Sequence, residues 1–182
     1  MALKATIFKL DLDIADMDRH YYVSHALTLA RHPSETDERM MARIVAFALN
    51  ADDTITFTRG LSADDEPALW KKDLTGAIDQ WIEVGLPDER RLRKASGRSH
   101  QVIVYAFGGR TADIWWEKSM RDFRRMDNLT IYALSEETTT ALEKLAQRTM
   151  RLSCTIQEGD ISLSDGETIV PVSFQVLLQP AE

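Results

Sequence analysis

The chain has 182 residues, of which 44% are hydrophobic and 28% charged, and this composition is typical of one globular domain spanning residues 1–182. No apolar run approaches the ~20 residues that cross a bilayer, so a membrane protein is not expected. The net charge of −7 argues against a strong nonspecific nucleic-acid binder but leaves room for a local basic channel. The single cysteine, Cys154, excludes an internal disulfide and a cysteine-rich zinc site. A reducing, cytoplasmic location is therefore expected.

The N-terminal part predicts strands followed by a helix. Residues 3–14 alternate between apolar and polar side chains, the pattern of a half-buried strand. Residues 20–31 could form a second strand or a short helix, and we favour a strand that continues into an irregular segment. Residues 34–49 carry apolar side chains at helical spacing, with Ser34 as the N-cap and Asp37 completing a capping-box-like pattern. Within this helix, Glu38 lies beside the apolar stripe.

The central part predicts three strands, a helix and a strand. We expect strands over residues 54–58 and from residue 68, separated by an acidic turn with Asp64, Asp65 and Glu66. A third strand over residues 78–84 leads into a helix that begins at Pro87 and ends near Gly97. Residues 101–107 form an apolar run typical of a strand buried on both faces.

The C-terminal part alternates between helices and strands. The predicted elements are helices over residues 112–123 and 136–150, and strands over residues 129–134, 152–158, 160–163 and 168–177. Because strands are followed by a helix and a doubly buried strand, the order predicts an α/β fold: a three-layer α/β/α sandwich with a mixed central sheet. The N- and C-terminal strands are expected to extend or flank that sheet.

Glu83 is the most informative single residue. It interrupts the apolar strand 78–84, and an isolated carboxylate costs several kcal/mol to bury. Three cations follow on the next helix, Arg91, Lys94 and Arg98, at a spacing that places them on one helical face. A buried acid facing a row of cations is either a structural ion pair or part of an active site. The residues themselves leave both interpretations open.

Four segments carry a resemblance to a known family: RHPSETDERMMAR (31–43), FTRGLSADDEP (57–67), IDQWIEVGLPDERRLRKA (78–95) and LAQRTMRLSCTIQEG (145–159). Over essentially its full length the chain resembles the bacterial YaeQ family. Its element order and acids are also similar to the restriction-endonuclease-like, or PD-(D/E)XK, nuclease superfamily. That second resemblance implies a core of helix, three strands, helix and strand.

The resemblance also implies a set of site residues. Glu38 matches the superfamily's acid on the first helix, and Glu66, with Asp65 as its alternative, matches the acid near the second strand. Glu83 matches the acid on the third strand. Gly85 stands where the superfamily has a lysine, and Lys94 is the natural substitute from the following helix.

These residues imply a metal-dependent phosphodiesterase or nuclease acting on DNA or RNA. Glu66 and Glu83 would hold Mg²⁺ or Mn²⁺, since hard cations prefer carboxylate oxygens. Lys94 would orient water or stabilise charge, and Arg91 and Arg98 would contact phosphates. The alternative is a catalytically inactive protein of the same fold that binds nucleic acid or protein, in which Glu83 only pairs with Lys94 or Arg91. The sequence does not fix the oligomeric state, and we favour a monomer.

Overall fold

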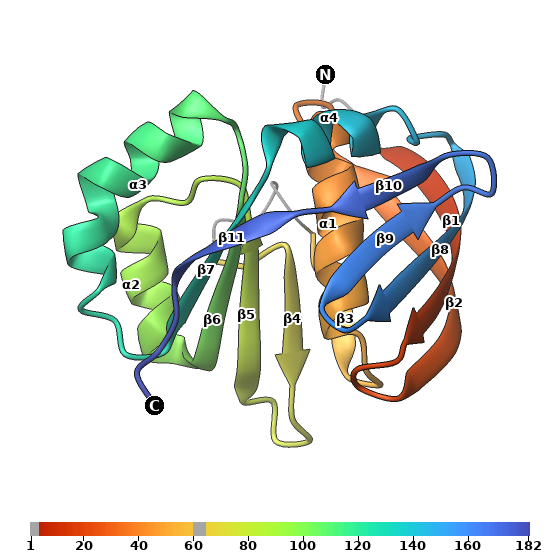
Figure 1. Ribbon diagram of the computed structural model, residues 1–182. Helices are drawn as coiled ribbons and strands as arrows, with labels where there is room; N and C mark the ends of the chain where they lie inside the picture. Colours follow the sequence, from red (N-terminus) through yellow and green to blue (C-terminus); the bar gives the residue numbers. More distant parts are fainter. Residues whose placement is uncertain (1–3, 60–64) are drawn as a thin grey trace. The chain divides into compact units, whose positions relative to one another are not determined.

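The computed structural model describes residues 4–59 and 65–182, which contain the helices and strands labelled in Figure 1. Part of the predicted acidic turn, including Asp64, lies outside the described residues. The elements are β1 (Thr6–Asp16), β2 (Tyr21–Arg31), α1 (Asp37–Asn50), β3 (Ile55–Phe57), β4 (Leu69–Lys72), β5 (Ile78–Val84), α2 (Glu89–Arg98), β6 (Ser99–Ala106), α3 (Arg110–Phe123), β7 (Leu129–Leu134), α4 (Glu136–Glu143), β8 (Thr149–Gln157), β9 (Asp160–Ser164), β10 (Ile169–Val172) and β11 (Phe174–Leu178).

The chain folds into two compact units, and each is assembled from separate stretches of sequence. The first comprises Met1–Ala48 and Glu137–Ser173, and the second comprises Leu49–Glu136 and Phe174–Glu182. The divisions fall near the end of α1, at the start of α4 and between β10 and β11. None of these points has the composition of a linker, which explains why the sequence predicts a single domain.

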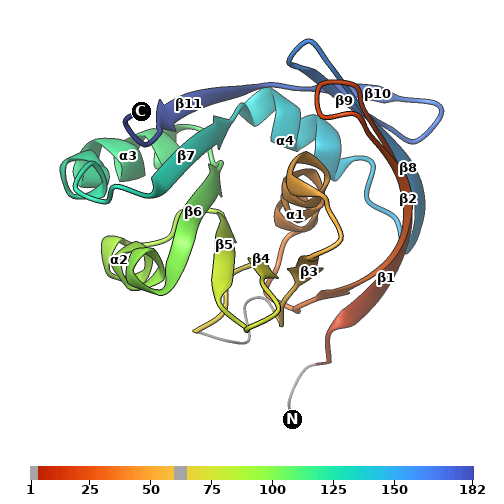
Figure 2. The same cartoon turned by 90° about the horizontal axis from the view of Figure 1, so that it is seen from below.

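The first unit is a sheet with the strand order β10-β9-β8-β1-β2. β1 pairs antiparallel with β2 along its whole length and parallel with β8. Its side chains alternate between buried and exposed, as the sequence predicts for residues 3–14, because successive side chains point to opposite faces of a strand. α1 lies on the concave side of this sheet (Figure 2), and every residue from 40 to 48 is buried.

The start of α1 differs from the prediction. The helix begins at Asp37, and the Thr36 hydroxyl accepts a hydrogen bond from the Arg39 amide at 3.1 Å. Thr36 is therefore the N-cap, because capping residues accept from the second or third amide of a helix. Ser34 instead bonds through its hydroxyl to the His32 ring at 2.6 Å. The predicted cap, Ser34, lies two residues before Thr36, so the sequence pattern placed the cap two residues too early.

Cys154 lies on β8 in the core of the first unit and is 2% exposed. Burial, helped by the negative charge of Asp16, raises the pKa of its thiol to about 11. Native protein at pH 8 should therefore not react with a thiol reagent, whereas protein unfolded in urea should react at once. Stability due to the neutral thiol is present below pH about 9 and is lost as pH rises towards 11. Equal labelling rates for native and unfolded protein would contradict this assignment.

The second unit is a sheet with the order β11-β7-β6-β5-β4-β3. β5, β6 and β7 run parallel, and the flanking pairs are antiparallel. α2 and α3 lie on the same side of it (Figure 2). The core on that side consists of Trp81, Leu92, Ala95, Val102, Val104, Ala106, Phe123, Leu129 and Ile131. Burying one large apolar side chain of this kind contributes about 1.5–3 kcal/mol.

Three further element boundaries correct the predictions. α2 begins at Glu89, not at Pro87, because the Asp88 carboxylate accepts from the Arg91 amide at 2.7 Å as the N-cap, and the helix continues past Gly97 to Arg98. α4 ends at Glu143 instead of continuing to residue 150.

The predicted strand over residues 168–177 is in fact two strands, β10 and β11. They belong to different sheets, so the chain passes from one sheet to the other between them (Figure 1).

The coarse fold prediction is confirmed. The chain is a mixed α/β protein, and α1, β3, β4, β5, α2 and β6 follow one another in the predicted order. Of the described N- and C-terminal strands, only β11 extends the central sheet, by pairing with β7. β1 and β2 combine with β8, β9 and β10 into a sheet of their own. No helix in the described ranges is long and apolar enough to cross a membrane.

Candidate functional site

Glu83 lies near the C-terminal end of β5 and is 4% exposed, as its place in an apolar strand predicts. Trp81 shares its face of the strand, since side chains two residues apart point the same way. The Trp81 indole nitrogen donates to Glu83 Oε1 at 2.8 Å. The Arg91 Nε donates to the same oxygen at 2.7 Å. The carboxylate therefore receives both a neutral and a charge-assisted hydrogen bond in a place with little access to water.

Arg91 joins the two acid-bearing segments of the second unit. While its Nε bonds to Glu83, its Nη2 donates to the backbone oxygen of Glu66 at 2.6 Å. The side chain of Arg91 is 28% exposed, so the guanidinium closes the outer end of the buried carboxylate. A cation thus already lies at the Glu83 carboxylate oxygen that a bound metal would use.

The carboxylate of Glu66 faces a different partner. Its oxygens accept from the Arg59 guanidinium at 3.1 and 3.3 Å. These hydrogen bonds are the main reason that the pKa of Glu66 is lowered, and Lys72 contributes through its charge. Glu66 therefore stays ionised, but its charge is directed to Arg59, a surface residue.

The side chain of Arg98 contacts the backbone of Asp65. Arg98 Nη1 reaches the carbonyl oxygen of Asp65 at 3.4 Å, and the guanidinium lies 5.4 Å from the centre of the Trp81 ring. A cation over an aromatic face is attracted to it and is held in place. Lys72 makes the same kind of contact with Trp70, at 3.8 Å, and the Trp70 and Trp81 rings meet edge to face.

Lys94 does not reach Glu83. It is exposed on α2 and makes no hydrogen bond or ion pair with the residues that the structure describes. Of the three cations predicted on one helical face, Arg91 pairs with the acid, Arg98 lies over Trp81, and Lys94 points to solvent. Arg91 and Arg98 therefore lie on the side of α2 that faces β5 and the segment containing Asp65 and Glu66.

Glu38 lies in the first turn of α1, where a negative charge is favourable at the positive end of the helix. α1 up to Ala48 belongs to the first unit, and Glu66 and Glu83 belong to the second. The convergence of Glu38 with the other two acids stays a prediction.

The arrangement of acids does not favour a metal as it stands. Among residues 4–59 and 65–182, no group of three or more His, Cys, Asp or Glu side chains is placed to hold an ion. Glu83 already accepts from Arg91 and Trp81, and Glu66 already accepts from Arg59. Mg²⁺ prefers freely available carboxylate and water oxygens.

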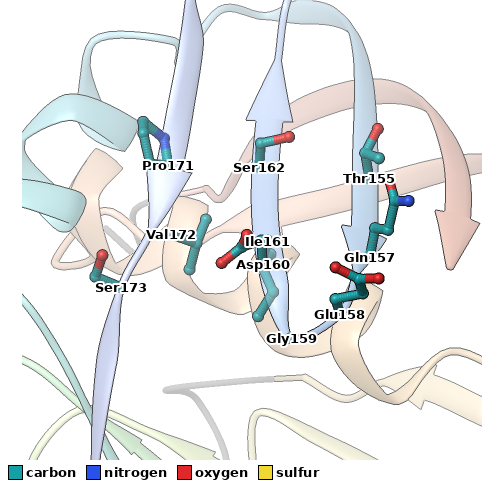
Figure 3. A pocket seen from close by; sticks show the side chains of 10 residues that line it. All are labelled: Thr155, Gln157, Glu158, Gly159, Asp160, Ile161, Ser162, Pro171, Val172 and Ser173. Carbon is teal, nitrogen blue, oxygen red and sulfur yellow. The ribbon is translucent and has the colours of Figure 1, made fainter. Parts of the chain in front are cut away.

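A polar hollow lies in the first unit, where the turn between β8 and β9 meets the end of β10 (Figure 3). It is lined by the hydroxyls of Thr155 and Ser162, the carboxylates of Glu158 and Asp160, and the ring of Pro171. The described residues that line it include no lysine or arginine. Two carboxylates without a cation repel phosphate, so this hollow does not suit an anionic substrate.

The first unit also contains a buried ion network that was not predicted from the sequence. Glu35, immediately before α1, binds the guanidinium groups of both Arg39 and Arg43. Glu35 and Arg43 side chains are each 2% exposed, and Arg43 also donates to the Ala30 carbonyl oxygen at 3.3 Å. The signal was present as an acid followed by arginines at i+4 and i+8: Arg39 and Arg43 share one face of α1, and Glu35 lies two residues before the helix.

The fold and this site define a mixed α/β protein in which a basic helix neutralises a buried strand acid. Comparisons with known proteins identify the family. The family described as "YaeQ protein" matches residues 1–174. The chain belongs to the YaeQ family.

Relatives match over the whole chain. Proteins named "Uncharacterized protein YaeQ" from Salmonella typhi and from Escherichia coli K12 are each 45% identical over 181 residues, covering 100% of both chains. The crystal structure of YaeQ from Xanthomonas axonopodis pv. citri is similar with a TM-score of 0.92 at 47% identity, over 97% of this chain and 99% of that one. YaeQ from Pseudomonas syringae has a TM-score of 0.92 at 36% identity, over 96% and 97%.

Proposed function

We propose that the protein binds the phosphate backbone of a nucleic acid through the cations of α2, and that Glu83 is the structural counter-ion of Arg91. The observation that carries this proposal is the pair of hydrogen bonds by which Arg91 holds Glu83 Oε1 and the Glu66 carbonyl oxygen. A carboxylate fixed in this way orients a guanidinium, and a metal would have to compete with that cation for it. The restriction-endonuclease-like layering expected from the sequence is part of the same proposal.

The exposed cations beside Arg91 supply the binding surface. Arg90 and Lys94 are exposed on α2, and Arg98 is exposed while its guanidinium lies over the Trp81 ring. Lys72 lies on β4, the strand that pairs with β5. Arginine and lysine contacts to phosphates position a nucleic acid without reading its sequence. Binding of this kind is local, so it is compatible with the net charge of −7.

Charge reversal on α2 tests the surface. In EDTA, the Lys94→Glu/Arg98→Glu variant should bind a labelled oligonucleotide at least about tenfold more weakly than the wild type, equivalent to about 1.4 kcal/mol. The affinity of the wild type should fall steeply with salt, and the variant should show a shallower slope. The matched control is Lys118→Glu on α3, where Glu117 is adjacent. Unchanged binding in the double variant would overturn the assignment to α2.

A metal-dependent nuclease is the second candidate, and one observation favours it. A single guanidinium touches both Glu83 and the segment of Glu66, so the two acids predicted as metal ligands come from neighbouring segments. Coordination of Mg²⁺ or Mn²⁺ would require Arg91 to move away, with Lys94 completing the site. Incubation of DNA and RNA with either metal separates the candidates. Cutting that is lost in Glu83→Ala would establish the nuclease, and binding without cutting supports the first proposal.

A further inference from the structure

The edge of the sheet in the first unit carries an unusual strand. The strand order β10-β9-β8-β1-β2 ends at β2, and in residues 4–59 and 65–182 no strand pairs with the outer edge of β2. β2 runs over Tyr21–Arg31 and keeps an unbroken register with β1. It has no lysine, arginine, aspartate, glutamate, proline or glycine before Arg31. A long edge with an unbroken register and no charged residue before Arg31 is a template for pairing with another strand.

The other edges are protected in the ways that natural proteins use. In the same sheet, β10 is short and contains Pro171, which cannot donate a ladder hydrogen bond. In the second unit, β3 covers only Ile55–Phe57, and β11 has an irregular register between Val176 and Leu178. Short strands, prolines and irregularities all discourage edge pairing. Among the described strands, β2 is the edge that lacks every one of these features.

We propose that β2 pairs antiparallel with β2 of a second copy of this chain, around a two-fold axis at Ala26. In that register each residue opposes the residue of the other copy whose number is 52 minus its own. Even-numbered residues therefore oppose even-numbered residues, and odd-numbered residues oppose odd-numbered ones. Exposed outer-face residues then oppose exposed outer-face residues, which keeps the faces of the two sheets continuous. The interface is isologous and closes as a dimer.

The side chains on the outer face match across this axis. Tyr22, which is 60% exposed, would lie opposite the small Ala30 of the other copy. Ser24 would face Thr28, a pair that can hydrogen-bond, and Ala26 would face itself. The two Arg31 side chains would be ten residues apart, about 34 Å, so they would not repel each other. This self-complementarity is the reason to choose a second copy over an unrelated strand.

Charge placed on the axis tests the dimer. Ala26 is exposed and lies opposite Asp11 of β1 within its own chain, so Ala26→Lys should be tolerated by the fold. Two lysines would nevertheless confront each other directly across the axis. In light scattering after gel filtration the wild type should have twice the mass of one chain, and Ala26→Lys should be monomeric. The control Ser153→Lys, on the same face of β8 opposite Asp13, should stay dimeric.

Cross-linking tests the register. Residues directly opposed in an antiparallel pair have Cα atoms about 4.5–5.5 Å apart, within the range of a disulfide. Ala26→Cys should therefore form a covalent dimer on mild oxidation. Ala30→Cys should not, because its two copies would lie about 27 Å apart. The native Cys154 is buried and should not compete. A wild type that is monomeric at every concentration would overturn the proposal, as would a dimer that is insensitive to Ala26→Lys and not cross-linked by Ala26→Cys.

Discussion

Replacement of Glu35 by alanine should lower the free energy of unfolding by about 3–5 kcal/mol, one of the largest effects of any single substitution outside the apolar core. Glu35 is the carboxylate partner of Arg43, and both side chains are 2% exposed. Burial lowers the pKa of Arg43, while Glu35 acts in the opposite direction. Removal of Glu35 would leave the guanidinium of Arg43 as a buried charge that no longer has the Glu35 carboxylate beside it.

Urea denaturation followed by circular dichroism measures this effect. The matched control is Glu89→Ala, which removes another carboxylate that pairs with an arginine four residues further on, Arg93. That pair is on the surface, where such interactions contribute about 0.3–0.5 kcal/mol. Similar losses for Glu35→Ala and Glu89→Ala would show that the buried network does not stabilise the first unit.

Substitutions of Glu83 and Arg91, the ion pair of the candidate site, should have coupled effects on the free energy of unfolding. Arg91→Ala should destabilise the protein by about 2–4 kcal/mol, because it removes the guanidinium from a carboxylate that is 4% exposed. Glu83→Gln should cost less, since the amide oxygen can still accept from Trp81. The double variant should cost less than the sum of the two, with a coupling energy of about 0.5–3 kcal/mol.

The same variants distinguish a counter-ion from a displaced metal site. Thermal unfolding is measured with and without Mn²⁺ for the wild type, Arg91→Ala and Glu83→Gln/Arg91→Ala. If Arg91 is only the partner of Glu83, Mn²⁺ changes none of the melting temperatures. Stabilisation of Arg91→Ala by Mn²⁺ that is lost in the double variant is the result predicted by the nuclease candidate, since a bound ligand raises stability.

The sequence was informative where a pattern was strong and local. The alternation of residues 3–14 gave β1, and the acid inside the apolar run 78–84 correctly indicated a buried Glu83 facing a cation from the next helix. Both predictions rest on periodicities that the backbone imposes directly. They required no knowledge of which strands pair.

What the sequence did not give depended on geometry over long distances. Nothing in residues 168–177 indicates that β10 and β11 join different sheets. The choice of Arg91 instead of Lys94 as the partner of Glu83 depends on how α2 is rotated over β5, which an i, i+3, i+7 pattern does not fix. Glu66 pairs with Arg59, which lies just after β3. No residue spacing in the sequence indicates this pair.

We propose that the cations of α2 bind a phosphate backbone without help from a metal held by Glu83. The most direct test is fluorescence anisotropy of labelled single- and double-stranded oligonucleotides in EDTA, comparing the wild type, Glu83→Gln and Lys94→Glu/Arg98→Glu. We expect binding by the wild type and by Glu83→Gln, and about tenfold weaker binding by the charge-reversed variant. Binding that appears only with Mg²⁺ or Mn²⁺ and disappears in Glu83→Gln would contradict the claim.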